Sequence, residues 1–235
     1  MTDVRIIPIV RIEALFEQRE WEFARDHAHE IKAHWETFKT RSPTLFDGRV
    51  LLQYERHLED GVFRARYLAT NYSAFLAWRD FGWPDKDIVN GFSMAALRAK
   101  DGAFLLGEMA GHTANPGKVY FAAGTPDPDD ITPSGEVDLL ANLMRELEEE
   151  TGLKPSEVSV GEGWTAVFEG QRIAFMRPVT IDMEAKAARA LILSRLAEQA
   201  HPELADIHIV RSRSEIDEAR MPLFARAYLE HVLGR

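Results

Sequence analysis

The sequence predicts an α/β protein in which helices cover a mixed β-sheet. Strand-like and helix-like stretches alternate along the second half of the chain, an order that suits a sheet sandwiched by helices. Short turns containing glycine join neighbouring strand-like stretches, as in β-hairpins. With 46% hydrophobic and 28% charged residues, the 235-residue chain has enough apolar material for one sizeable core and an extension.

The first 90 residues predict an extension made of helices and a β-hairpin. Ile31, Trp35 and Phe38 form an apolar stripe at helical spacing, which packs either inside the molecule or against a second copy in a homodimer. Glu59-Asp60-Gly61 is typical of a hairpin turn. The expected elements are a helix over residues 15–38, strands over 50–57 and 62–70, and a short helix over 72–81.

Residues 91–235 predict the main domain, and residues 1–90 the extension. Lys100-Asp101-Gly102 and Glu169-Gly170 are expected hairpin turns, and Gly152 is expected to stop the central helix. A loop rich in Pro and Asp, residues 124–135, precedes that helix. The expected strands cover residues 92–98, 103–109, 118–123, 158–168, 171–181 and 207–210, and the expected helices 137–151, 184–199 and 222–233.

Composition excludes several classes of protein. The chain has no cysteine, which excludes thiol nucleophiles, Cys-based zinc sites and disulfides, and fits a cytoplasmic protein. Its net charge of −10 comes from residues 101–235, which hold 13 Lys and Arg against 23 Asp and Glu, so nucleic acid is not an expected partner. No apolar run is long enough to span a membrane. A small phosphate compound would need local positive charge, for which a divalent metal held by the excess carboxylates is the natural candidate.

The central helix carries clustered carboxylates near its C-terminal end. Glu146, Glu149 and Glu150 are spaced i, i+3 and i+4 and therefore share one side of the helix, while Leu143 and Leu147 lie on its apolar stripe. Like charges at this spacing cost roughly 0.3 kcal/mol per pair, and the helix dipole disfavours them in the last turn. Such a cluster is either a solvated surface or a site for a hard divalent cation, which binds clustered carboxylate oxygens.

The residues around this cluster favour the second interpretation. Arg145-Glu146-Leu147-x-Glu149-Glu150-x-Gly152-Leu153 fills every specified position in the second half of the Nudix box, seven positions within nine residues. The sequence therefore resembles the Nudix hydrolase family, over roughly residues 90–235. This resemblance implies an α/β/α sandwich with a mixed sheet, and a metal-dependent enzyme that hydrolyses a phosphoanhydride bond.

The first half of the box departs from the family pattern. The family places a Gly, five residues, a Glu and seven further residues before the Arg, and this spacing puts Val137 at the Glu position. Glu136 lies one residue too early and Asp138 one too late, and eleven residues separate Gly124 from Glu136. Residues 125–135 therefore resemble an insertion. Either Glu136 or Asp138 takes the place of the missing Glu through the loop, or its role is absent.

By resemblance, the box residues would hold Mg²⁺ or Mn²⁺ on a diphosphate. Glu149 and Glu150 would be metal ligands, and Glu146 a further ligand or the base that takes a proton from water. Gly124 would offer its backbone carbonyl to the metal. Arg145 would hold the carboxylates in place by an ion pair, with Glu149 as its i+4 neighbour. The chemistry agrees, because metals neutralise the oxygens that shield phosphorus and lower the pKa of bound water.

Candidates outside the box are weaker. Glu203 lies either on the surface or within reach of the metal, since family members often take one more acid from a later loop. Lys118 and Arg98 are candidates for binding substrate phosphate, although cations at strand ends more often face water. Glu136 is a further candidate for substrate binding. An aromatic run is more typical of core than of a base-stacking platform: Tyr72, Phe75, Trp78 and Phe81.

The favoured function is hydrolysis of the diphosphate linkage in a nucleoside diphosphate derivative, namely a nucleotide sugar, an ADP-ribose-like compound or a dinucleotide. The long N-terminal segment and the Pro/Asp loop favour such a substrate over a plain nucleoside triphosphate. The alternative is a non-catalytic Nudix-fold module that binds a metabolite, which the displaced first Glu motivates. An isoprenyl diphosphate isomerase shares the fold but generally needs a catalytic cysteine, which this chain lacks.

Overall fold

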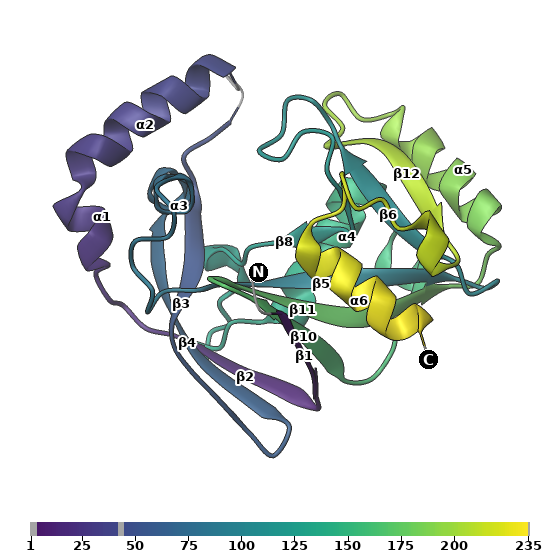
Figure 1. The fold of residues 1–235 in the computed structure, drawn as a ribbon, viewed down its shortest axis with the longest axis horizontal. Coiled ribbons are helices and arrows are strands. Elements are labelled where there is room, and N and C mark those ends of the chain that lie inside the picture. The colour runs from purple at the N-terminus through teal and green to yellow at the C-terminus, as the bar shows by residue number, and fades with distance from the viewer. Residues whose placement is uncertain (1–3, 42–44, 235) are drawn as a thin grey trace.

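The computed structural model describes residues 4–41 and 45–234. Most of its β-strands form one large mixed sheet, which we call the main sheet (Figure 1). Among the described residues nine strands belong to it: β1 (Val4–Ile9), β5 (Asn90–Ala99), β6 (Phe104–Met109), β7 (Val119–Tyr120), β8 (Ala123–Gly124), β9 (Val158–Val160), β10 (Trp164–Glu169), β11 (Arg172–Ile181) and β12 (Leu204–Val210). Along its central path, β1-β10-β11-β5-β6-β12, the pair β11 and β5 is parallel and the other neighbours are antiparallel.

Helices cover both faces of the main sheet, as the sequence predicts. One face is covered by α4 (Leu139–Thr151) and α5 (Ala185–Leu196), and the other by α6 (Leu223–Leu233) (Figure 1). Alternation along β5 explains this arrangement, because Ala95 and Leu97 pack in the core under α4 and α5, whereas Met94 and Ala96 pack under α6. The expected α/β/α sandwich is therefore confirmed. None of the described helices is long and apolar enough to cross a membrane.

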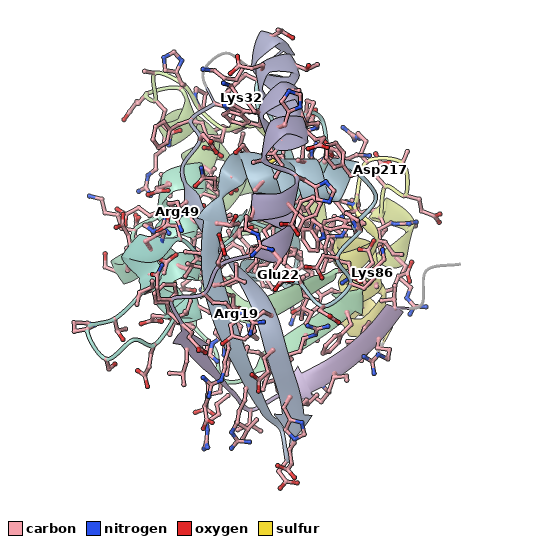
Figure 2. The ribbon with its side chains drawn as sticks, turned by 90° about the vertical axis from the view of Figure 1, so that its left-hand side faces the viewer. Arg19, Glu22, Lys32, Arg49, Lys86 and Asp217 are labelled. Atoms are coloured by element: carbon pink, nitrogen blue, oxygen red, sulfur yellow. The ribbon has the colours of Figure 1, made fainter. Side chains whose placement is uncertain are left out.

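The N-terminal extension is built on a second sheet, which we call the small sheet. Its elements, with the helices beside it, are β2 (Arg11–Phe16), α1 (Glu22–Asp26), α2 (Ala28–Arg41), β3 (Arg49–Glu59), β4 (Val62–Asn71) and α3 (Tyr72–Asp80). In the described residues the three strands have the order β2-β4-β3. Trp35 of α2, Leu52 of β3 and Trp78 of α3 pack in one core cluster. The apolar stripe predicted over residues 31–38 therefore packs inside the molecule. Figure 2 faces this extension, with Lys32 on α2 and Arg49 at the start of β3.

The prediction of one helix over residues 15–38 is wrong in two respects, namely where the helix begins and that it is continuous. Leu15 and Phe16 belong to β2, which pairs with β4, and the helical part is divided into α1 and α2. In β2 alternate residues turn inward, since Ile12 and Ala14 pack in the core. Pairing with a distant strand, which local spacing does not reveal, therefore overrides the helical pattern at Leu15.

Most other elements agree with the predictions. The hairpin of β3 and β4 turns through Asp60 (φ 50°) and Gly61 (φ 74°), the left-handed pair that such a tight turn needs. The expected strand over residues 158–168 is divided into β9 and β10, and the strand over 118–123 into β7 and β8. The sequence does not predict β1, whose Pro8 is tolerated because β1 lies at the edge of the main sheet.

The small sheet and the main sheet share buried contacts. Gln53 of β3 is buried, donates through Nε2 to the hydroxyl oxygen of Tyr67 (2.6 Å) and exchanges two backbone hydrogen bonds with Val89 (2.9 Å each). A Cβ at Gly91 would come within 2.0 Å of Gln53 Nε2, so β5 approaches the small sheet closely. A division into extension and main domain at residue 90 stays a prediction, and β1 belongs to the main sheet although it precedes that boundary.

Candidate active site

The helix α4 presents its carboxylates in a fixed orientation because its two ends and its apolar side are held. At the N-terminal end, Asp138 Oδ1 accepts hydrogen bonds from the backbone N–H groups two and three residues later (3.0 and 2.9 Å). Gly152 ends the helix in the left-handed conformation (φ 71°), as predicted. Leu143 and Leu147 are fully buried in the core shared with the main sheet. The rotation of the helix is therefore fixed.

Glu146, Glu149 and Glu150, which we call the box glutamates, gather beside β8. A Cβ at Gly124 would lie 2.2 Å from Cδ of Glu146, so the β8 backbone runs directly against this carboxyl group. Glu150 is 4% exposed, and its Oε1 accepts the backbone N–H of Ala123 (3.3 Å). The Glu149 side chain extends into solvent. The structure thus brings Gly124 and the box glutamates together.

Burial and neighbouring carboxylates raise the pKa of all three box glutamates. Burial, then the charges of Glu149 and Glu203, raise the pKa of Glu146 to about 7, although Arg145 acts in the opposite direction. Burial and the charge of Glu146 raise the pKa of Glu150 well above its ordinary value. Burial, then the charge of Glu203, raises the pKa of Glu149. The site therefore concentrates negative charge that Arg145 alone does not compensate.

Arg145 ties the helix to the loop before it. Its guanidinium donates to both carboxylate oxygens of Asp130 (3.0 and 2.9 Å) and to Oδ2 of Asp127 (3.2 Å). It also lies 3.2 Å from Oε1 of Glu146 and 3.7 Å from Oε2 of Glu149. Asp130 is 5% exposed, and burial raises its pKa even though Arg145 acts to lower it. The loop that resembles an insertion therefore supplies two carboxylates to Arg145.

The sequence argument misses these two aspartates, although they carry a local pattern. Asp127 precedes a short 3-10 turn, Pro128–Asp130, and its Oδ1 accepts the N–H of Asp129 (2.7 Å). Oδ2 of Asp130 accepts the N–H of Asp127 in return (2.9 Å). An Asp, a Pro at the first turn position and a second acid three residues after the Asp form a capping box, which is visible in the sequence.

The two acids proposed to replace the missing Glu occupy other positions. Asp138 caps α4, and Glu136 is exposed and forms a backbone bridge with Leu15 of β2. Within the described residues neither of them forms an ion pair with Arg145. Asp127 and Asp130 form ion pairs with Arg145 instead. Which acid, if any, replaces the missing Glu in function stays a prediction.

Glu203 lies close enough to the box glutamates for its charge to raise the pKa of all three. The pKa values of Tyr72 and Tyr120 are raised mainly by burial, and the charge of Glu203 raises them further. Tyr72 begins α3 of the extension and Tyr120 ends β7. Residues from segments far apart in the chain therefore lie close enough to Glu203 to be affected by its charge. Phe75 and Trp78 are buried, as the sequence predicts, whereas Phe81 is 44% exposed, so the prediction that it lies in the core is wrong.

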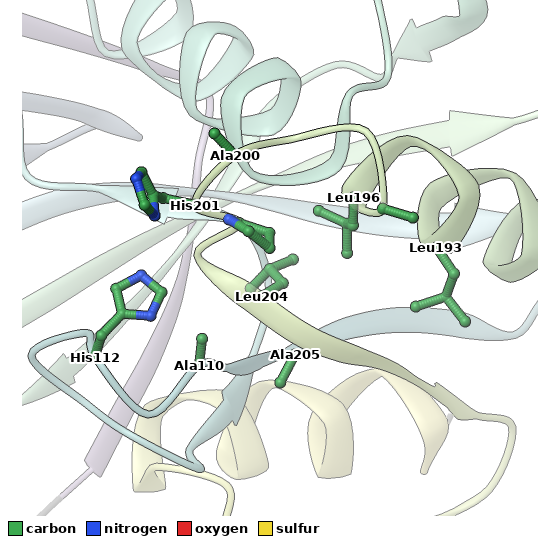
Figure 3. Close-up of a pocket in the computed structure, with 10 residues that line it drawn as sticks. Ala110, His112, Leu193, Leu196, Ala200, His201, Leu204 and Ala205 are labelled. Atoms are coloured by element: carbon green, nitrogen blue, oxygen red, sulfur yellow. The ribbon is translucent and has the colours of Figure 1, made fainter.

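A cavity of about 540 Å³ adjoins the segment that carries Glu203. Its wall is mostly apolar, and residues of α5 and the start of β12 form much of it. Figure 3 shows His112 and His201 on one side of this cavity, away from Leu193 and Leu196 of α5. Glu203 stands between two lining residues, Pro202 and Leu204, so the cavity lies next to the carboxylate cluster.

The predicted substrate-binding cations do not gather at the box glutamates. Arg98 lies on the face of the main sheet covered by α6, where it donates to the carbonyl of Gly102 (2.8 Å) and stacks over Phe104 (5.4 Å). Lys118 donates to the carbonyl of Ala219, just before α6 (3.2 Å). A role for either residue in substrate binding stays a prediction.

The donors at the site fit a hard divalent cation. The three box glutamates and the β8 carbonyl groups offer oxygen ligands, which Mg²⁺ and Mn²⁺ prefer. Their raised pKa values mark negative charge that a cation would compensate. Across residues 4–41 and 45–234, no three acidic or histidine side chains are arranged around one metal position. The box glutamates therefore suit a hard cation by the chemistry of their oxygens, not by a ready-made coordination geometry.

Comparisons with known proteins identify the family to which the chain belongs. A search of curated proteins finds no match. Similar solved structures include RenU, a Nudix hydrolase from M. smegmatis (16% identity, 61% of this chain and 83% of that chain covered, TM-score 0.40), and the MutT protein from Methanosarcina mazei Go1 (19%, 61% and 91%, 0.41). Another is an Ap4A hydrolase from C. elegans (13%, 63% and 100%, 0.38). The family model of the NUDIX domain matches residues 89–228, more than half of the chain, which shows that the chain belongs to the Nudix family and is a Nudix hydrolase.

Proposed function

We propose that this enzyme cleaves the diphosphate linkage of a nucleoside diphosphate derivative, such as a nucleotide sugar, an ADP-ribose-like compound or a dinucleotide. The observation that carries the proposal is the gathering of Gly124 and the box glutamates on one side of α4. Mg²⁺ or Mn²⁺ is the proposed cofactor, since Nudix hydrolases generally need divalent metal ions. Glu149, Glu150 and the Gly124 carbonyl would hold it, with Glu146 as a further ligand or as the base, and it would neutralise diphosphate oxygens and lower the pKa of bound water.

Two carboxylates are candidates for the base that takes a proton from water. Glu146 is partly buried against the Gly124 backbone, and burial raises the pKa of its carboxyl group to about 7 in the metal-free protein, so this carboxylate holds a proton more readily than an ordinary glutamate. Glu203 is exposed, and its charge acts on Glu146. In this proposal Arg145 is a positioning residue, which holds Glu146 and Glu149 through the contacts described above.

The surroundings of the site support a substrate larger than a nucleoside triphosphate. Tyr72 brings the extension towards Glu203, and the cavity of about 540 Å³ adjoins the same residue. The cavity wall is largely apolar with His112 and His201 beside it, which suits a ring or an uncharged arm more than a further phosphate. We propose that the moiety linked to the nucleoside diphosphate enters this cavity.

The proposal predicts metal-dependent turnover of a defined set of compounds. We would incubate the protein with nucleotide sugars, ADP-ribose, dinucleotides, CoA and nucleoside triphosphates, each with Mg²⁺ or Mn²⁺, and separate the products by chromatography. The expected result is cleavage at a diphosphate, lost when the metal is chelated. Tight binding of one of these compounds without turnover in either metal would contradict the proposal and favour a non-catalytic binding module.

Replacing Gly124 by Ala is expected to lower the rate of hydrolysis by about 10²-fold, because the new Cβ would overlap the Glu146 carboxyl group and displace it. The fold should survive, since the atoms it meets are the end of a flexible side chain. Gly111→Ala is the matched control, because a Cβ there meets nothing within 4 Å. We would measure kcat and the thermal midpoint of both variants. Unchanged kcat in Gly124→Ala would mean that the position of Glu146 is not critical.

A further inference from the structure

A second cavity, of about 430 Å³, lies where the extension meets the main sheet. Its walls come from β1, the β3–β4 hairpin and the turn between β10 and β11, which lie together on one side of the molecule (Figure 1). The cavity borders Val89, whereas Gly124 pairs with Ser93, about 13 Å further along at the spacing of residues in a strand. The buried Gln53 and its bonds to Val89 stand beside it. This cavity is therefore separate from the box glutamates.

Basic side chains line this second cavity. Arg5, Arg56 and His57 contribute to its wall, and none of the described residues that line it is acidic, although the chain has a net charge of −10. Within the described residues neither arginine forms an ion pair. The opposing charges nearby are Asp87, which acts on Arg56, and Glu59, whose carboxylate lies 3.6 Å from His57 Nε2. The two arginines therefore bring positive charge to the cavity that no direct ion pair within the described residues neutralises.

The two arginines are held in place without using all of their donors. Arg56 donates one N–H to the carbonyl of Asp87 (2.9 Å), which leaves the rest of its guanidinium for a ligand. The guanidinium carbon of Arg5 lies over the ring of Phe168, 5.0 Å from its centroid, and this contact uses none of the N–H donors of the side chain. Partial burial lowers the pKa of Arg56, a cost that a bound anion would offset. A Cβ at Gly170, also in the wall, would meet nothing within 4 Å, so the mouth of the cavity is open.

We propose that this cavity is a second, non-catalytic site that binds a small phosphate-bearing anion through Arg5, Arg56 and His57. Arginine forks match phosphate oxygens in paired hydrogen bonds, and several donors converging on one cavity suit a group with several acceptor oxygens. Because the donors come from β1 of the main sheet and β3 of the small sheet, a bound anion joins the two sheets. Binding of the anion would therefore stabilise the packing of the main sheet against the small sheet. This inference does not rest on the reaction proposed for the box glutamates.

The test is calorimetric titration with inorganic phosphate, AMP and adenosine in EDTA, so that no metal is present at the box glutamates. The unmodified protein should bind phosphate or AMP, and the Glu149→Gln/Glu150→Gln protein should bind it equally well. Arg5→Gln/Arg56→Gln should weaken binding at least tenfold. Arg49→Gln is the matched control, because Arg49 lies on the same strand as Arg56 and also donates to a backbone carbonyl, that of Ala69 (3.0 Å) (Figure 2).

The outcomes separate the proposal from its alternatives. AMP binding tighter than phosphate identifies a nucleotide as the source of the anion, and equal affinity identifies free phosphate. The proposal would be overturned if the unmodified and Arg5→Gln/Arg56→Gln proteins bound with equal affinity, or if Glu149→Gln/Glu150→Gln lost binding. It would also be overturned if adenosine bound with the same affinity as AMP. The same holds if nothing bound at 10 mM ligand, roughly the concentration that a weak phosphate site requires. If the double variant does not fold, Arg5→Gln alone, an exposed change on an edge strand, should still weaken binding several-fold.

Discussion

Replacing Glu150 by Gln is expected to lower the rate of hydrolysis by on the order of 10³-fold and, at the same time, to stabilise the metal-free protein. Glu150 is 4% exposed, and burial and the charge of Glu146 raise its pKa well above its ordinary value. Ionised without a cation, this carboxylate therefore destabilises the fold, and the neutral amide of Gln relieves that cost. The amide is a poorer ligand for a hard cation, so activity is lost where stability is gained.

Replacing Glu146 by Gln is also expected to stabilise the metal-free protein, by an amount that rises with pH. Its pKa is about 7 in the folded metal-free protein against 4.5 as the ordinary value, so the folded state binds the proton more tightly than the unfolded chain. The free energy of unfolding should then fall as pH rises from about 4.5 to about 7, by about 3 kcal/mol for this group. Glu146→Gln removes that loss. Its thermal midpoint in EDTA should exceed that of the unmodified protein by roughly 5–10 °C at pH 8, and by much less at pH 5.

Glu148 provides the matched control for both substitutions. It lies between the box glutamates in sequence but is exposed, and it is not a specified residue of the box. Glu148→Gln should leave kcat and the pH dependence of the thermal midpoint unchanged. Added Mg²⁺ or Mn²⁺ should raise the midpoint of the unmodified protein at pH 8 and have little effect on Glu150→Gln. Full activity in Glu150→Gln, or the same pH dependence in Glu146→Gln as in the unmodified protein, would contradict this account.

The central helix and its glutamates could be predicted because the relevant information is local. Spacings of three and four residues place Glu146, Glu149 and Glu150 on one side of any helix, and Gly152 marks its end. The α/β/α sandwich follows from the same kind of information, through alternating strand and helix patterns. The contacts that the residues around the box make depend on segments that are not neighbours in the sequence. Asp130 reaches Arg145 only because the loop folds back over α4, and no spacing rule connects them.

The N-terminal strands illustrate a second limit. β1 pairs with β10 and β2 pairs with β4, so each is stabilised by a partner far along the chain. Locally, Pro8 argues against a strand, and Leu15 continues the apolar spacing of the helix that follows. The extension was therefore predictable as helices with a hairpin, but its attachment to the main sheet was not. The same attachment creates the second cavity, whose donors Arg5 and Arg56 lie in strands of different sheets.

Replacing Arg145 by Met is expected to lower the free energy of unfolding by about 3 kcal/mol, because it leaves the buried Asp130 carboxylate without its cation. Asp130 is 5% exposed, and both of its oxygens accept hydrogen bonds from Arg145. Asn142 Nδ2 donates to Oδ2 of Asp130 as well (3.0 Å), and this bond alone does not neutralise the charge. This cost lies at the low end of the range for a buried ion pair, since Arg145 keeps partial contact with solvent.

A double-mutant cycle distinguishes loss of this pair from loss of packing. Asp130→Asn keeps the shape of the side chain and its bond from Asn142 but removes the buried charge, so adding it to Arg145→Met should cost less than the two single changes added together, with a coupling energy of about 1–3 kcal/mol. Urea unfolding of the four proteins measures it. Additive costs would mean that Arg145 stabilises the loop by packing alone. Coupling would mean that the loop before α4 stabilises the box through a charge pair. Arg145, which is held by Asp127 and Asp130, also lies 3.2 Å from Glu146.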